Sequence, residues 1–256
     1  MIELAIDDGV AEITLNAPDK LNALDEAALA DLAAAYGQAG EAKVRALVLR
    51  GEGRAFCAGR DISGVDPASD DARGLLADTV EPLLKAIAAF GAPTFASAHG
   101  ACLGIGLGLL IATDVVYVAE SARFGSPFAK LGAALDSGGH ALFFERLGAH
   151  RALDLIYTGD LMTGSEAVSA GLFSRVLPDA DVLDFTRTKA AAAARGATAS
   201  FLASKRMIAE LRESRVGLWD AVAAENRAQG ELSATEDYRE GFAAFQQKRT
   251  PAFRGR

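Results

Sequence analysis

Apolar and polar residues alternate in two different rhythms over the first part of the chain. A period of two predicts strands, and apolar residues three and four apart predict helices. Gly9 separates two alternating segments, which predicts an opening β-hairpin. In order, the predicted elements are strands at 2–8 and 10–16, a helix at 24–36 that ends near Gly37 or Gly40, and a buried strand at 44–50.

The same succession continues toward the middle of the chain. A Gly-Ala-Pro break after residue 90 separates a helical pattern from the next strand pattern. The predicted elements are a helix at 72–90, a strand at 94–100, a helix at 104–112 and a strand at 114–120. A strand, a turn and a helix thus follow one another at least three times, which predicts a layered or spiral α/β core.

Beyond about residue 196 the strand pattern is lost and only helical spacing remains. The predicted helices span 200–213, 218–230 and 235–248. We therefore divide the chain into an α/β core, residues 1–195, and a C-terminal helical region, residues 196–256. Helices of this kind cover their own core or dock on another subunit, and the sequence alone leaves both possibilities open.

Composition and charge restrict the function classes. The chain has 256 residues, of which 50% are hydrophobic, and a formal net charge of −8, which argues against general affinity for nucleic acid or anionic membranes. The apolar run at 101–112 is interrupted by glycines and closed by Asp114, well short of the roughly 20 residues that a membrane span needs. Two cysteines and no secretory pattern lead us to expect a cytoplasmic protein.

No pattern for a metal or a nucleotide cofactor is found. The three histidines are scattered, and neither cysteine has a neighbouring ligand. The GIGLG segment at 104–108 lacks the glycine spacing of a dinucleotide loop, and no phosphate-binding loop of the G-x-x-x-x-G-K-[ST] type occurs. We expect no metal and no cofactor.

Two glycine-containing turns, at 53–62 and 100–114, and an isolated acid carry the candidate chemistry. Such turns can direct backbone N–H groups at one point, and Asp136 stands beside a Ser-Gly-Gly turn. An oxyanion hole with a single carboxylate base suits proton transfer next to a carbonyl group. The alternatives are tight packing for the glycines and an N-cap of the following helix for Asp136.

Five ordered motifs make the chain resemble the crotonase (enoyl-CoA hydratase/isomerase) superfamily along essentially its full length. They are PDKLNALD at 18–25, AFCAGRDI at 55–62, HGACLGIGLGLLIATD at 99–114, ARFGSPFAKLG at 122–132 and EGFAAFQQKRTPAF at 240–253. The resemblance implies a spiral core of ββα turns and a C-terminal helical layer that forms a trimer, often paired into a hexamer. It also implies an acyl-CoA thioester as substrate, so that coenzyme A is part of the substrate.

The resemblance assigns site residues by position. The amides that polarise the thioester carbonyl fall on Ala58 and Ile105, and the base falls on Asp136. The expected substrate-binding residues are Phe56, Arg60, Asp61, Gly104, Gly106, Phe128 and Lys248, the last of which matches a lysine that family members present to a coenzyme A bound in the neighbouring subunit.

Departures from the family pattern favour one reaction over another. The two glutamates of the hydratases fall here on Gly108 and Phe128, which cannot transfer protons. Asp136 matches members in which one aspartate acts alone, chiefly isomerases that shift a double bond or open a ring. We therefore expect an acyl-CoA isomerase with Asp136 as its acid and base. The alternatives are a non-catalytic acyl-CoA-binding protein and a weak hydratase.

Overall fold

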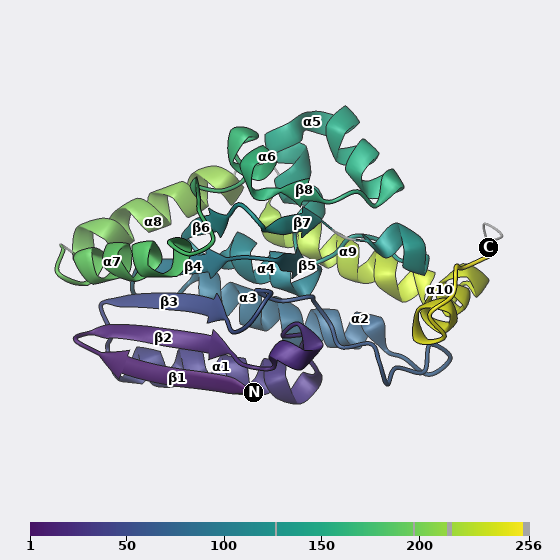
Figure 1. Cartoon of the computed structure of the whole chain (residues 1–256), viewed down its shortest axis with the longest axis horizontal. Coiled ribbons are helices and arrows are strands. Elements are labelled where there is room, and N and C mark those ends of the chain that lie inside the picture. The colour runs from purple at the N-terminus through teal and green to yellow at the C-terminus, as the bar shows by residue number, and fades with distance from the viewer. Residues whose placement is uncertain (126, 197, 214–216, 253–256) are drawn as a thin grey trace.

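The computed structural model of the chain describes residues 1–125, 127–196, 198–213 and 217–252 (Figure 1). Phe253, the last residue of the closing motif, lies outside the described residues, as does Ser126. The strands are β1 (Ile2–Asp7), β2 (Val10–Leu15), β3 (Ala46–Gly51), β4 (Thr94–Ala98), β5 (Ala101–Leu103), β6 (Val115–Ala119), β7 (Arg123–Gly125), β8 (Met162–Thr163) and β9 (Arg175–Leu177).

The helices fill most of the remaining chain. They are α1 (Glu26–Glu41), α2 (Ala72–Gly74), α3 (Glu81–Ala88), α4 (Ile105–Ala112), α5 (Gly139–Thr158), α6 (Gly164–Ser169), α7 (Val182–Ala194), α8 (Thr198–Glu213), α9 (Leu218–Leu232) and α10 (Glu236–Gln246). A π-helical segment, η2 (Leu75–Val80), joins α2 to α3, and two short 3-10 turns are η1 (Pro18–Lys20) and η3 (Pro127–Leu131). The predicted boundary at residue 196 falls between α7 and α8.

The strands form two sheets, so the predicted α/β class is confirmed. The larger sheet has the order β1-β2-β3-β4-β6-β9, and the smaller one has the order β5-β7-β8. The opening hairpin pairs antiparallel, as predicted, and every further pairing in the larger sheet is parallel. Strand β3 is buried on both faces: Val48 packs in the cluster with residues of α7, whereas Leu49 belongs to the main core on the opposite face.

Successive strands are divided between the two sheets, which winds the chain into a spiral. Strand β4 joins the larger sheet, β5 joins the smaller one, and α4 follows; strands β6 and β7 repeat this division. The predicted strand at 94–100 is β4, which ends at Ala98, and the unpredicted strand β5 follows it after a turn at Gly100 (φ 54°). Three-residue strands such as β5 and β7 are too short for an alternating pattern to reveal.

Helix α1 is longer than the sequence predicted. Asp25 caps its start by accepting a 2.9 Å bond from the Ala28 N–H. The helix passes through Gly37 and Gly40, the predicted ends, and stops at Glu41. The left-handed turn that follows is made by Lys43 (φ 53°) instead of by a glycine.

The C-terminal helix α10 packs on the core of the same chain. Its Gly241 fits closely against the Leu131 backbone of η3, where a side chain at position 241 would clash. Tyr238 and Phe242 stack with ring centroids 4.4 Å apart and form a small apolar cluster with Leu131. This packing places α10 beside the segment that leads to Asp136.

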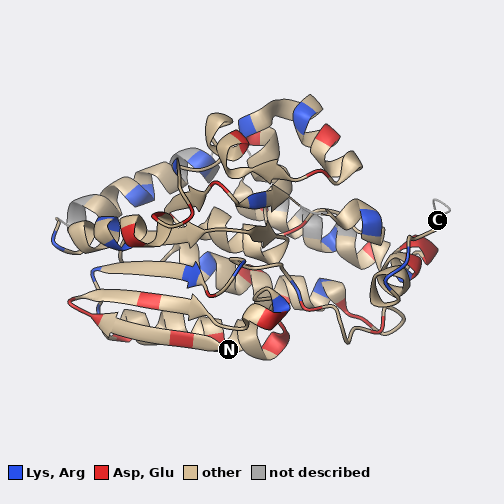
Figure 2. Ribbon diagram, viewed as in Figure 1, with Lys and Arg blue, Asp and Glu red and all other residues tan. Residues whose placement is uncertain are grey.

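In the view of Figure 2, Lys and Arg stand out on α7 and α8, whereas β1 and β2 carry acidic residues. No helix in the described ranges has the length and apolar character to span a membrane.

Asn22 offers a test of how the chain holds the first glycine turn. It is fully buried at φ 56°, accepts from the Ala17 N–H and donates to the carbonyls of Glu52 and Ala55. Because three bonds are lost and their partners stay buried, we expect Asn22→Ala to lower the free energy of unfolding by about 3 kcal/mol in a urea titration. Asn16→Ala, which removes one exposed bond to Glu3, serves as the control and should cost less than about 1 kcal/mol.

Candidate active site

The two glycine turns lie side by side because the segments before them pair as parallel strands. Cys57 pairs with Cys102: the Cys57 N–H donates to the Ala101 carbonyl at 2.9 Å, and its carbonyl accepts from the Leu103 N–H at 3.0 Å. Two residues further along both segments, Gly59 therefore faces Gly104. A Cβ atom at position 59 would lie 2.9 Å from the Leu103 carbonyl oxygen, so this approach requires glycine.

The first amide predicted for the oxyanion hole, that of Ala58, is already engaged, and this prediction is corrected. Its N–H donates to the Leu21 carbonyl at 2.9 Å. In the same peptide unit the Cys57 carbonyl points the opposite way, toward Leu103. The Ala58 N–H thus points away from the second glycine turn.

The peptide of Arg60, and not that of Ala58, turns its N–H toward the second glycine turn. The Gly59 carbonyl accepts from the Leu24 N–H at 2.8 Å, and because the peptide is trans, the Arg60 N–H of that unit points to the other side. Gly104 lies on that side: a Cβ atom at position 104 would be 3.8 Å from the Gly59 Cα. Within the described ranges the Arg60 N–H has no acceptor.

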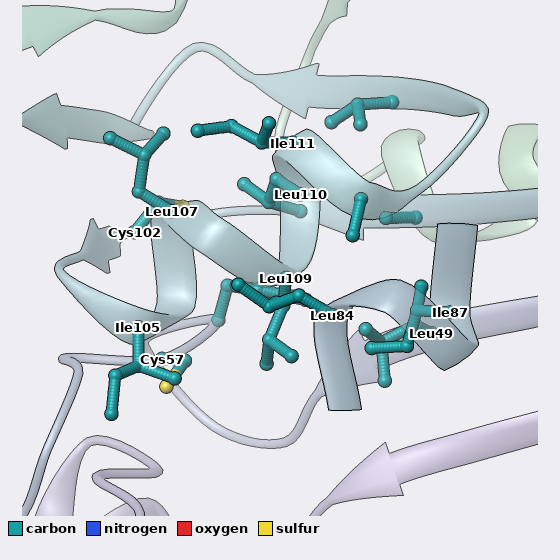
Figure 3. Packing of buried hydrophobic residues seen from close by; sticks show 14 of the residues in the cluster. Leu49, Cys57, Leu84, Ile87, Cys102, Ile105, Leu107, Leu109, Leu110 and Ile111 are labelled. Carbon is teal, nitrogen blue, oxygen red and sulfur yellow. The ribbon is translucent and has the colours of Figure 1, made fainter. Parts of the chain in front are cut away.

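The position of the Ile105 N–H is compatible with the role predicted for it. It is the first residue of α4, and its side chain lies beside Cys57 at the start of that helix (Figure 3). The first amides of a helix have no partner within the helix, and none of the described residues accepts from the Ile105 N–H. Since parallel pairing sets Arg60 opposite Ile105, the two free N–H groups can bind one oxygen atom at the positive end of α4.

Asp136 is the one acidic residue in the described part of the chain that is buried as a whole, at 6% exposure. Its Oδ1 accepts from the Ser137 hydroxyl at 2.9 Å. Gly138 is the N-cap residue of α5, and the Asp136 backbone carbonyl accepts from the Gly139 N–H at 3.0 Å, so Asp136 stands just before the start of this helix.

Gly108 lies between the start of α4 and the segment that carries Asp136. It lies one turn along α4 from Ile105, and a Cβ atom at position 108 would lie 2.5 Å from the Ser137 Cβ. At position 108 the family resemblance places a glutamate of the hydratases. In this chain Ser137, next to Asp136, fills the space that such a side chain would need. A carboxylate at 108 would require this segment to move.

Phe128 forms an apolar wall next to the glycine turns. The end of its ring lies 3.1 Å from the position of a Cβ atom on Gly104. On its other side the ring lines a cavity of about 10 Å³, together with Leu135 and Phe143, which has room for about one water molecule. A role of Phe128 in lining an acyl pocket stays a prediction.

Three other predicted residues are engaged within the protein. Phe56 is fully buried in the core. The Asp61 carboxylate accepts from Ser63 and Lys20, and the Ser63 hydroxyl, followed by Lys20, keeps the pKa of Asp61 below its ordinary value although burial acts against it. The Arg60 guanidinium forms two hydrogen bonds with Asp70, so its backbone, and not its side chain, faces the site.

Two remaining predictions concern Gly106 and Lys248. Gly106 packs against the first turn, since a Cβ atom there would lie 2.5 Å from the Cys57 carbonyl oxygen. Lys248 is exposed at the end of α10, and Gln246, two residues earlier, donates to the Val65 carbonyl of the same chain at 2.6 Å. The structure thus brings Lys248 near the loop after Asp61, whereas a bond to a ligand stays a prediction.

Sequence analysis missed Asp70 and Tyr238, which lie next to Arg60. The Tyr238 hydroxyl donates to Asp70 at 3.3 Å across 168 positions of sequence, and no local pattern indicates such a contact. The shift from Ala58 to Arg60, by contrast, follows from the parallel register of the two turns. Among the described residues, no group of three His, Cys, Asp or Glu side chains could hold a metal ion.

Comparison with known proteins agrees with this geometry. The profile of a family described as "Enoyl-CoA hydratase/isomerase" matches residues 5–256. The chain is 38% identical to a probable enoyl-CoA hydratase of Rhodobacter capsulatus over 100% of its length and 98% of the relative, and 30% identical to the 1,2-epoxyphenylacetyl-CoA isomerase of Escherichia coli over 98% and 97%. The crystal structure of an enoyl-CoA hydratase from Mycobacterium avium subsp. paratuberculosis superposes with a TM-score of 0.87 at 29% identity, covering 99% of this chain and 98% of that one.

The reactivity of the two cysteines tests whether the paired glycine turns exclude solvent. Both are buried, and burial raises the pKa of the Cys57 thiol to about 12 and that of Cys102 well above its ordinary value. A raised pKa leaves almost no thiolate at pH 8, so the folded protein should not react with a thiol-specific disulfide reagent, whereas the unfolded chain should release two equivalents. Rapid reaction of either thiol in the folded protein would contradict this packing.

Proposed function

Since the chain belongs to the enoyl-CoA hydratase/isomerase family, whose members process acyl-CoA thioesters, we propose that it shifts a double bond within an enoyl-CoA. Asp136 is the sole acid and base of this proposal. The observation that carries it is the burial of this one carboxylate beside Gly108 and Ser137, while the positions of both hydratase glutamates hold residues that cannot transfer protons.

The reaction begins with the thioester oxygen accepting hydrogen bonds from the N–H groups of Arg60 and Ile105. Asp136 takes a proton from the carbon chain, and the electron pair left behind is delocalised onto that oxygen as an enolate. Fixed donors stabilise this developing charge because they need no reorganisation, and each contributes about 2.7–4 kcal/mol. Asp136 then returns the proton two carbons away, so no atom is gained or lost.

Hydration makes a different demand on the site. A hydratase must deprotonate the attacking water and protonate the substrate carbon, and each such proton transfer contributes roughly 10²–10⁴ in rate. Gly108 leaves no room for a side chain, and Phe128 presents an apolar ring. Neither position offers a group that could transfer a proton, so hydration would have to rely on Asp136 alone.

Hydratase activity is nevertheless the second candidate, and the names of relatives favour it. The Rhodobacter capsulatus relative is called a probable enoyl-CoA hydratase, and another, 35% identical over 95% of this chain, is the 2,3-dehydroadipyl-CoA hydratase of Escherichia coli. Binding of acyl-CoA without turnover is the third. The Escherichia coli epoxyphenylacetyl-CoA isomerase shows that isomerases also occur among the relatives.

Assembly, location and cofactor use extend the proposal. On family likeness we propose a homotrimer, or a hexamer formed by two paired trimers, in the cytoplasm. The chemistry needs no cofactor, because coenzyme A arrives as part of the substrate and both proton transfers use Asp136.

An assay with two substrates tests the proposal. Purified protein is incubated with trans-3-hexenoyl-CoA and trans-2-hexenoyl-CoA in parallel, and the products are separated and weighed by mass spectrometry. We expect the 3-enoyl thioester to become the 2-enoyl thioester at unchanged mass. A product 18 Da heavier would establish a hydratase instead, and binding without any product would establish a non-catalytic role.

Asp136→Asn removes the base while keeping the shape of the side chain. We expect the isomerisation rate to fall at least about 10²-fold with little change in affinity for acyl-CoA. Asp154→Asn, which makes the same charge change at an exposed position of α5, is the control and should keep full activity. Full activity in Asp136→Asn would show that another group moves the proton.

Ile105→Pro tests a backbone donor directly. Proline lacks the N–H group but is tolerated at the first position of a helix, where Ile105 stands. We expect kcat to fall by about 10²–10³ while the thermal unfolding temperature stays close to that of the wild type. Ile105→Val, which keeps the N–H, should retain activity, and an active proline variant would remove Ile105 from the oxyanion hole.

A further inference from the structure

The Arg60 peptide stands at the beginning of an irregular stretch, residues 61–71, which forms only turns. An oxyanion donor is effective only if it is fixed before the charge develops. The backbone bonds of Leu24 to Gly59 and Asp61 hold this peptide from one side. The contacts of the Arg60 side chain show what holds it from the other.

The Arg60 side chain reaches across this stretch to Asp70. Its Nη1 lies 2.8 Å from Oδ2 and its Nη2 lies 2.6 Å from Oδ1, which is the two-pronged geometry of a strong ion pair. The Asp70 side chain is only 6% exposed, and that of Arg60 is 20% exposed. Although burial alone would lower it, the bonds and charge of Asp70 raise the pKa of the Arg60 guanidinium.

Helix α10 holds the same stretch at two points. The Tyr238 hydroxyl donates to Asp70 Oδ2 from a side chain that is 2% exposed, and Gln246 Nε2 donates to the Val65 carbonyl. Burial, together with the neighbouring Asp70 carboxylate, raises the pKa of the Tyr238 phenol, so it stays a hydrogen-bond donor throughout the neutral range. The loop that follows Arg60 is thus closed by an ion pair and fastened to α10.

We propose that Asp70 is a positioning residue for the oxyanion hole: with the Tyr238 hydroxyl, it holds Arg60 so that its N–H stays aligned with that of Ile105. Docking of α10 and formation of the hole are coupled through this contact. The inference rests on the proposed function only in that the two N–H groups bind the thioester oxygen. Asp70 itself touches no substrate.

The carbonyl stretching frequency of bound hexanoyl-CoA measures the hole without turnover. Two hydrogen bonds weaken the C=O bond, so we expect infrared difference spectra with [1-¹³C]hexanoyl-CoA to show a shift to lower frequency in the wild type. Hexyl-CoA, the thioether without the carbonyl oxygen, reports the remainder of the binding site. Affinities for both ligands are measured by calorimetry.

Asp70→Asn and Tyr238→Phe should each reduce the frequency shift, while affinity for hexyl-CoA stays unchanged. We expect kcat for the 3-enoyl substrate to fall about tenfold to 10²-fold in Asp70→Asn and about twofold to tenfold in Tyr238→Phe, with KM little altered. Asp70→Glu, which keeps the charge, should restore part of the shift. The matched control is Glu12→Gln, which removes a carboxylate on β2 that pairs with Arg50 and Arg187, and this variant should behave as the wild type.

The outcomes separate this inference from the proposed function. A wild type that binds hexanoyl-CoA without a frequency shift would overturn the oxyanion hole itself. A normal shift in the wild type that is fully kept in Asp70→Asn and Tyr238→Phe would overturn the positioning role and leave the function standing. Tyr238→Phe decides the matter if Asp70→Asn does not fold, because it removes one oxygen atom and keeps the ring stacked on Phe242.

Discussion

The parallel pairing of Cys57 with Cys102 is the constraint on which the site depends. It is only one bridge wide, yet it sets Gly59 against Gly104 and fixes which peptide of the first turn faces the second. In a regular strand the N–H groups of residues 58 and 60 would point the same way, so their opposite directions here come from Gly59 between them, at φ 98°.

The surroundings of the pair of amides are apolar and closed. Phe128 lies against Gly104, and Gly108 packs closely on Ser137. Ile105 packs beside the buried Cys57 (Figure 3). In such surroundings an electric field from fixed donors is weakly screened, so a few backbone dipoles act strongly on a developing charge. A single carboxylate, moving one proton between two carbons, fits a site that offers little room for water.

The sequence predicted the parts of the fold that follow from local periodicity. The hairpin and the C-terminal helices have clear apolar spacing, strand β3 and helix α4 are short continuous apolar runs, and each is present. Strands β5 and β7 were missed because three residues carry no period, and their pairing in a second sheet is set by tertiary contacts. The assignment of Ala58 failed for the same reason: its type and spacing match the motif, but only the register shows where its N–H points.

Backbone donors separate the chemistry of the site from the identity of its residues. Any amino acid except proline at positions 60 and 105 presents the same N–H group. Positions 59 and 104, by contrast, require glycine, because the two backbones approach each other closely there and φ is 98° and 50°. The side chain at 105 is therefore free to diverge, and with it the wall of the pocket at the start of α4, whereas the side chain at 60 is tied to Asp70. Substitutions of such side chains can change which substrate the pocket accepts, while the backbone N–H groups of the oxyanion hole stay in place.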